Sequence, residues 1–98
     1  MEIKESDFVQ SLEKGLNVLL AFSNEKKAMT LSEVAEKTDL SRAAARRFLL
    51  TYTYLGYMQT DGKYFSLTPK VLDLGYNYIS SMDIIEIAKP FMLKLSKE

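Results

Sequence analysis

Two helix-start signals, close together in the middle of the chain, constrain the fold more than any other feature. Thr30-Leu31-Ser32-Glu33 is a capping-box pattern, in which the Thr hydroxyl and the Glu carboxylate accept hydrogen bonds from exposed amides at a helix start. Ser41 is placed to cap another helix soon afterwards. The sequence therefore predicts a short helix over 31–37, a tight turn over 38–40 and a second helix from Ser41 to about Tyr54.

The turn between the two helices has suitable residues. Asp39 occupies a position that often holds Gly, and Asp tolerates left-handed backbone at a modest cost. Ala35 is small where the helices must approach closely, and Leu40 is apolar where it can fill their interface.

The second helix has two contrasting faces. At 100° per residue, one arc is apolar and comprises Ala45, Phe48, Leu49, Tyr52 and Leu55. The other side carries Ala43, Arg46, Arg47 and Leu50. We therefore expect the arginines to face away from the core.

Further elements flank this pair of helices. A helix is expected over 11–23 with Ser11 as its N-cap, followed by a polar loop over 24–29. Gly56 ends the second helix of the pair, and Asp61-Gly62 predicts a type I′ hairpin turn between strands over 57–60 and 63–66. That turn places Met58 opposite Phe65 and puts Met58, Phe65 and Leu67 on the core face.

The end of the chain is expected to be helical again. Thr68-Pro69 offers an N-cap and a proline at the first helical position, so a helix should run through 70–79. Its apolar residues go nearly all the way round, which indicates packing on two partners. A break is expected over 80–83, then a last helix from Asp83 with a kink or restart at Pro90.

The predicted order is that of a winged helix-turn-helix, mainly α with a small β-hairpin, followed by a linker helix. The expected domains are a winged helix-turn-helix over 1–68, the linker helix over 69–82, and the start of a further domain over 83–98.

With no Cys and no His in 98 residues, disulfides, thiolate zinc sites and imidazole catalysis are excluded. We expect no enzyme activity, no cofactor and no metal, and no apolar run is long enough for a membrane span, so a cytoplasmic protein is expected.

Charge is unevenly distributed although the net charge is zero. Residues 37–70 hold six Lys or Arg against two Asp, and all three arginines fall within 42–47. Because affinity for DNA depends on neutralising phosphates, the basic middle region favours duplex DNA as the partner. An ordinary solvated helix face and a protein-binding winged helix are the alternatives.

The roles of individual side chains stay open at this stage. Arg46 and Arg47 lie 100° apart on the helix, so one could meet a phosphate while the other reads a guanine, or one could pair with Asp39 or Glu36. Tyr64, near the hairpin tip, is the aromatic residue that could stack on a base. Glu33 and Glu36 beside Lys37 are interpreted as helix capping and solubility, not as a catalytic carboxylate pair.

Several spaced motifs resemble the DNA-binding half of the IclR family of bacterial transcription regulators. They are Phe8 to Leu16, Leu31-Ser32-Glu33-Val34-Ala35, Ser41 to Leu50, Leu55-Gly56-Tyr57 and Phe65-Ser66-Leu67. The segments Arg42 to Leu50 and Leu67 to Tyr76 look most like the branch that controls aromatic-acid catabolism, such as protocatechuate and para-hydroxybenzoate pathways. Many members carry Ser or Thr where this chain has Ala43 and Ala44.

The resemblance implies a homodimeric, sequence-specific DNA-binding domain whose small-molecule effector binds a C-terminal domain that this chain lacks. This chain alone is then expected to show no ligand response. The candidate DNA contacts are Thr30, Ser32, Ser41, Arg42, Ala43, Ala44, Arg46, Arg47, Lys63 and Tyr64. The candidate dimer contacts are Phe8 just before the first helix, Leu12 and Leu16 within it, and Val71, Leu72, Leu74, Tyr78 and Ile79 in the linker helix.

Overall fold

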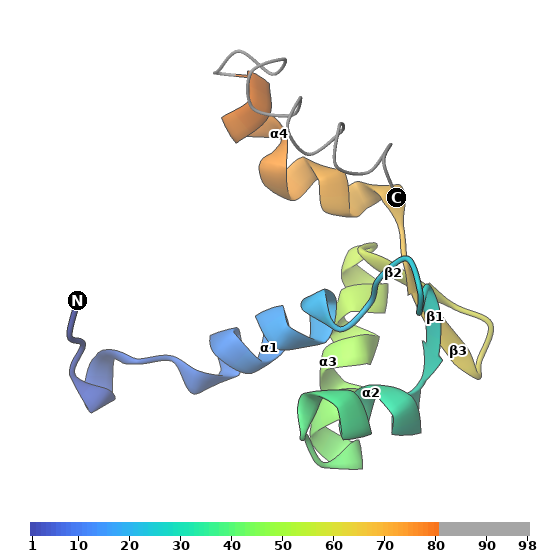
Figure 1. The fold of residues 1–98 in the computed structure, drawn as a ribbon, viewed down its shortest axis with the longest axis horizontal. Helices are drawn as coiled ribbons and strands as arrows, with labels where there is room; N and C mark the ends of the chain where they lie inside the picture. Colours follow the sequence, from blue (N-terminus) through green and yellow to red (C-terminus); the bar gives the residue numbers. More distant parts are fainter. Residues whose placement is uncertain (81–98) are drawn as a thin grey trace. The chain divides into compact units, whose positions relative to one another are not determined.

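The computed structural model describes residues 1–80 of the chain, and the chain divides into two compact units after Thr68. The first unit, Met1–Thr68, contains a 3-10 helix followed by three α-helices and three strands (Figure 1). Their bounds are Glu5–Asp7 for the 3-10 helix, then α1 Gln10–Leu20, β1 Ala28–Thr30, α2 Leu31–Thr38, α3 Arg42–Leu55, β2 Met58–Thr60 and β3 Tyr64–Leu67. The predicted fold, mainly helical with a small hairpin, is confirmed.

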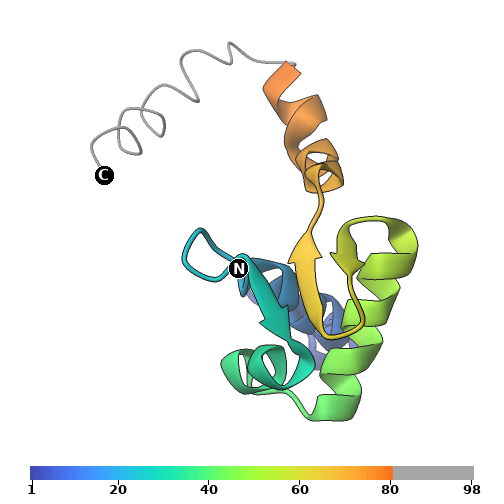
Figure 2. The ribbon, with the colours of Figure 1, turned by 90° about the vertical axis from the view of Figure 1, so that its right-hand side faces the viewer.

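The strands form one antiparallel sheet in the order β1-β3-β2 (Figure 2). β1 was not predicted, because residues 24–29 were expected to form a loop. Met29, at the centre of this three-residue strand, is buried, while Ala28 before it is exposed. Such a short segment shows too little alternation to be recognised from sequence, and it is a strand because it pairs with the distant β3.

The hairpin forms with a register that differs from the predicted one. Met58 lies opposite Leu67 and Thr60 opposite Phe65. Gly62 has positive φ but Asp61 does not, which rules out the expected type I′ turn centred on Asp61-Gly62. The Asp61 side chain instead accepts hydrogen bonds from the backbone amides of Lys63 (2.9 Å) and Tyr64 (2.8 Å). The shift is two residues, so Met58 and Phe65 still face the core.

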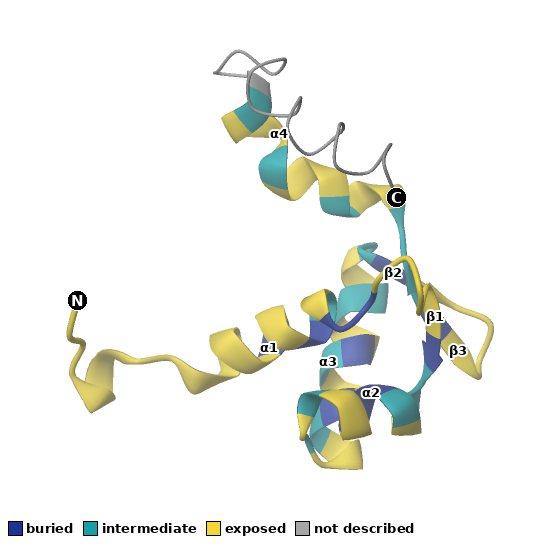
Figure 3. Ribbon diagram, viewed as in Figure 1, coloured by how far each residue is buried: buried dark blue, intermediate teal, exposed yellow. Residues whose placement is uncertain are grey.

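The core lies where the three helices meet the sheet (Figure 3). It is formed by Val18, Ala21, Phe22, Met29, Val34, Ala35, Ala45, Leu49, Met58 and Phe65, and no charged residue of 1–80 is buried in it. This cluster draws residues from α1, α2, α3 and all three strands, so it fixes α2 and α3 relative to the sheet.

The first helix differs from its predicted bounds of 11–23. α1 begins at Gln10 and its N-cap, Val9, makes no side-chain hydrogen bond, so Ser11 is not the cap. The helix ends at Leu20, and the following chain turns at Ser23, whose backbone amide donates to the Lys26 carbonyl and whose hydroxyl accepts from the Lys26 amide.

The second unit begins at Pro69 with a 3-10 helix, Pro69–Leu72, and continues as α4, Asp73–Ser80. The continuous helix expected over 70–79 is therefore divided, and Ser80, where a break was expected, is helical. The predictions for 81–83, the last helix from Asp83 and the change at Pro90 lie outside the described residues.

Candidate nucleic-acid interface

The helix-turn-helix geometry follows the predicted caps. Thr30 Oγ1 accepts from the Glu33 amide (3.2 Å), and Glu33 Oε1 accepts from the Thr30 amide (3.0 Å), which completes the capping box. Asp39 adopts left-handed backbone with φ of 58°, and the Leu40 amide donates to the Ala35 carbonyl (3.0 Å). Ser41 Oγ accepts from the Ala44 amide (3.1 Å) and starts α3. The predicted turn and both helix starts are confirmed.

The surface of α3 is divided as the sequence indicates, with one exception. Ala45 and Leu49 are buried, and Phe48 and Tyr52 are half-buried against the core. Leu55 was expected in the same arc, but it lies in the last turn of the helix and is 48% exposed. The opposite side, Ala43, Arg46, Arg47 and Leu50, is exposed.

The two adjacent arginines have no acidic partner in the part of the chain that the structure describes. The possible pairs of Arg46 or Arg47 with Asp39 or Glu36 do not form there, and the ion pair present is that of Lys26 with Glu33. Both guanidinium groups therefore stand exposed on the side of α3 opposite the core.

Arg42 is tied to the neighbouring helix. Its Nη1 donates to the Ser32 hydroxyl in the first turn of α2. The first turn of α3 and the first turn of α2 are thereby joined through two of the candidate contact residues.

The β2–β3 hairpin lies next to the start of α2 because β3 pairs with β1. Thr30 pairs with Tyr64 across β1 and β3, so the start of α2 adjoins the base of the hairpin tip. Lys63 Nζ lies 5.4 Å from the centroid of the Tyr64 ring, within the range of a cation–π contact. The amides of Tyr64 and Lys63 that bind the Asp61 carboxylate hold its pKa below the usual value, so the tip is ordered by an ionised side chain.

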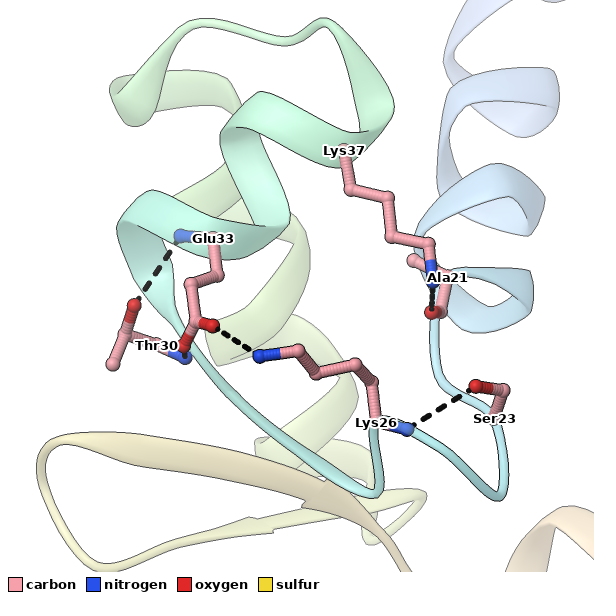
Figure 4. Close-up of polar contacts among 6 residues, drawn as sticks. All are labelled: Ala21, Ser23, Lys26, Thr30, Glu33 and Lys37. Carbon is pink, nitrogen blue, oxygen red and sulfur yellow. Dashed lines mark hydrogen bonds and ion pairs between the residues drawn. The ribbon is translucent and has the colours of Figure 1, made fainter.

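One cation beside this region was not singled out from sequence. Lys26 Nζ lies 2.8 Å from Glu33 Oε2 (Figure 4). The Lys26 hydrogen bond and the Thr30 amide lower the pKa of Glu33 to about 2, and the same bond raises the pKa of Lys26. Sequence reasoning missed Lys26 because it lies in a loop seven residues before its partner, a spacing that no helix or strand period marks.

The candidate residues are thus brought together to different extents. Thr30, Ser32, Arg42, Lys63 and Tyr64 are linked by the contacts described above, whereas Ala43, Arg46 and Arg47 stand apart on α3. Ser41 and Ala44 serve the start of that helix. Among the candidate dimer contacts, Phe8, Leu12, Leu16, Leu72, Leu74 and Tyr78 are exposed, and Val71 and Ile79 are half-buried.

Comparison with known proteins decides the family. Residues 11–62, more than half of the chain, match the IclR helix-turn-helix domain. The chain belongs to the IclR family. This match runs from α1 to the hairpin tip and includes β1, α2, α3 and β2 but not β3.

Relatives and a solved structure agree with this membership. The Pca operon regulatory protein of Acinetobacter baylyi is 40% identical over 96 residues, which cover 98% of this chain and 34% of that protein. The p-hydroxybenzoate hydroxylase transcriptional activator of the same organism is 42% identical over 91 residues, which cover 93% of this chain and 34% of that protein. A crystal structure from Rhodococcus sp. RHA1 is 54% identical, with a TM-score of 0.72, covering 92% of this chain and 36% of that one.

This chain thus spans about a third of the length of its curated relatives. It carries the helix-turn-helix DNA-binding domain of IclR-type transcription regulators, and the matched relatives are regulators, not enzymes. No helix within residues 1–80 is long and apolar enough to cross a membrane.

Proposed function

We propose that this IclR-family chain recognises a specific duplex DNA sequence with α3 in the major groove and the β2–β3 hairpin against the flanking backbone. The observation that carries the proposal is the position of all three arginines in the first half of α3, exposed and outside the core. A recognition helix reads base edges with residues of its N-terminal half, and Arg is the commonest partner of guanine.

The other candidate residues have supporting roles in this proposal. Thr30, Ser32 and Ser41 lie at helix starts, where hydroxyls and amides bind phosphates, and Ala43 and Ala44 leave room for base edges and methyl groups. Lys63 and Tyr64 would meet the backbone beside the major groove. A protein-binding winged helix, the alternative, is not favoured by the family match.

A selection experiment tests this function. Duplexes enriched by the purified chain from a random-sequence library provide an operator, and binding is then measured from low to high salt. Affinity should fall steeply with salt, because each phosphate contact releases counterions. Lys63→Ala should weaken binding to selected and random duplexes by similar factors. Failure to enrich any sequence, or binding independent of salt, would contradict the proposal.

The chain is also proposed to act as a homodimer. Leu12 and Leu16 leave an apolar side of α1 exposed, and Phe8 just before this helix is exposed as well. Leu72, Leu74 and Tyr78 are exposed on the second unit. A two-fold pair would present two α3 helices to half-sites about 34 Å apart or a multiple of that distance. Sedimentation tests this, and deleting 69–82 should lower operator affinity far more than deleting 83–98. A monomer at tens of micromolar would contradict dimerisation through these residues.

The biological role proposed is control of aromatic-compound catabolism in the bacterial cytoplasm, by analogy with the Pca and p-hydroxybenzoate regulators. Residues 83–98 would begin the effector domain, and residues 69–82 would transmit its response. Calorimetry of this chain with aromatic acids should show no saturable binding. Saturable binding with altered DNA affinity would place the sensor within these 98 residues.

A further inference from the structure

The exposed surface of α3 has two flanks that face different helices. Arg42 donates to Ser32, so the flank of α3 that bears Arg42 faces α2. Arg46 follows Arg42 by four residues and shares this flank. Ala44, Arg47, Phe48 and Thr51 instead line a groove together with residues of α1. The two adjacent arginines are therefore not equivalent.

The groove between α1 and α3 is built from Gln10, Ser11 and Lys14 on one side and the four α3 residues on the other. Its volume is about 500 Å³. Phe48 and Ala44 contribute apolar surface to it. Lys14 and Arg47 bring two positive charges, and none of the described residues that line the groove is acidic.

A further observation increases the preference of this groove for an anion. α1 begins beside it at Gln10, and its N-cap provides no side-chain acceptor for the first amides of the helix. The Leu12 amide donates to the Val9 carbonyl (3.1 Å), and the helix dipole gives this end of α1 a partial positive charge, which Glu13 in the first turn reduces. Proteins contact DNA phosphates with the side chains of Lys, Arg, Ser and Gln and with helix N-termini.

We propose that the α1–α3 groove is a phosphate-binding site for the DNA backbone, in which Lys14 and Arg47 hold a phosphate. Arg46 is then the arginine that reads a base. This inference rests on the proposed DNA-binding function and adds α1 to the DNA contact surface. It also assigns different roles to two neighbouring residues that the sequence does not distinguish.

The phosphate-binding and base-reading roles predict different losses of DNA affinity when single residues are replaced. Lys14→Ala and Arg47→Ala should each weaken binding to the selected operator and to random duplex by similar factors. Each should also reduce the slope of log affinity against log salt by about 1. Arg46→Ala should weaken operator binding by about 5- to 150-fold while changing random-duplex binding much less.

A matched control separates the site from overall charge. Lys27→Ala removes one exposed positive charge from the loop before β1 and should leave the salt slope nearly unchanged. Circular dichroism and thermal unfolding establish that each variant is folded, which is expected because Lys14, Arg46 and Arg47 are all exposed.

The outcomes distinguish this inference from the proposed function. If the unmodified chain binds its operator with steep salt dependence but Lys14→Ala behaves like Lys27→Ala, the groove is not a phosphate site. Operator-specific loss in Arg47→Ala would make Arg47 the base reader and overturn the assignment. Altered sedimentation of Lys14→Ala without DNA would show that a second copy occupies the groove. No salt-dependent DNA binding by the unmodified chain would instead contradict the proposed function itself.

Discussion

At the scale of single residues, the contact between α1 and α3 depends on Gly15. The Tyr52 hydroxyl donates to the Gly15 carbonyl, and a Cβ at Gly15 would lie 3.2 Å from Tyr52 Oη and 3.4 Å from Phe48 Cε1. The absence of a side chain therefore lets the two helices approach closely. Burial raises the pKa of Tyr52, whose hydroxyl is protonated and able to donate at neutral pH even at its ordinary pKa.

Removing this hydroxyl should have a measurable effect on stability. Tyr52→Phe should lower the free energy of unfolding by about 1 kcal/mol, because one partly buried hydrogen bond is lost while the ring stays in place. Denaturant unfolding measures the change. Tyr54→Phe is the control, since Tyr54 is 90% exposed, and it should change stability by less than about 0.5 kcal/mol. Equal effects of the two substitutions would argue against the Tyr52–Gly15 contact.

The Glu33 carboxyl should titrate at unusually low pH. Its folded pKa, about 2, lies below the ordinary value of 4.5, so its stabilising contribution is present above pH 4.5 and is lost as pH falls towards 2. NMR titration of the carboxyl measures this pKa directly. Lys26→Ala should move it upward, because the largest cause of the shift is removed. An unchanged Glu33 pKa in Lys26→Ala would show that the ion pair does not persist in solution.

The conformation of a residue could be predicted from sequence where it depends on near neighbours in the chain. The caps at Thr30 and Ser41 and the left-handed Asp39 depend on neighbours within a few positions, and all three have the expected conformation. Gly15 and Lys26 could not be predicted, because their roles depend on partners 37 and seven residues away.

At the scale of elements, the hairpin shows how a turn sets strand register. The Asp61 carboxylate accepts from two successive backbone amides, and Gly62 supplies positive φ at the next position. A hairpin was predictable from alternating residues around Asp-Gly. Its register was not, because Asp61 uses its side chain to cap the turn and does not adopt the left-handed backbone that a type I′ turn requires.

The order of the hairpin tip should depend on the Asp61 acceptor. Asp61→Ala should speed hydrogen exchange of the Lys63 and Tyr64 amides, since both lose their hydrogen-bond partner. Asp61→Asn keeps an oxygen at the same place and should preserve most of the protection. Exchange measured by NMR compares the variants. Equal protection in Asp61→Ala and the unmodified chain would contradict this account of the turn.

At the scale of the whole molecule, a chain of zero net charge still presents a basic surface. The arginines gather on one helix, and the acidic residues lie mostly outside 37–70, so a sequence average conceals the charge that DNA would meet. The helical order, the basic face and the family were predictable from sequence. The strand β1 was not predictable, since it exists only through pairing with β3. The groove between α1 and α3 was not predictable either, because it depends on how two helices far apart in the sequence cross.

An NMR titration with the selected duplex shows whether α3 and the hairpin meet DNA. Amide shift changes should concentrate in residues 41–47 of α3, in the hairpin tip and at the start of α2. The salt dependence of the affinity should be steep in the same titration. Shift changes confined to the exposed apolar side of α1, with α3 and the hairpin unaffected, would contradict the account.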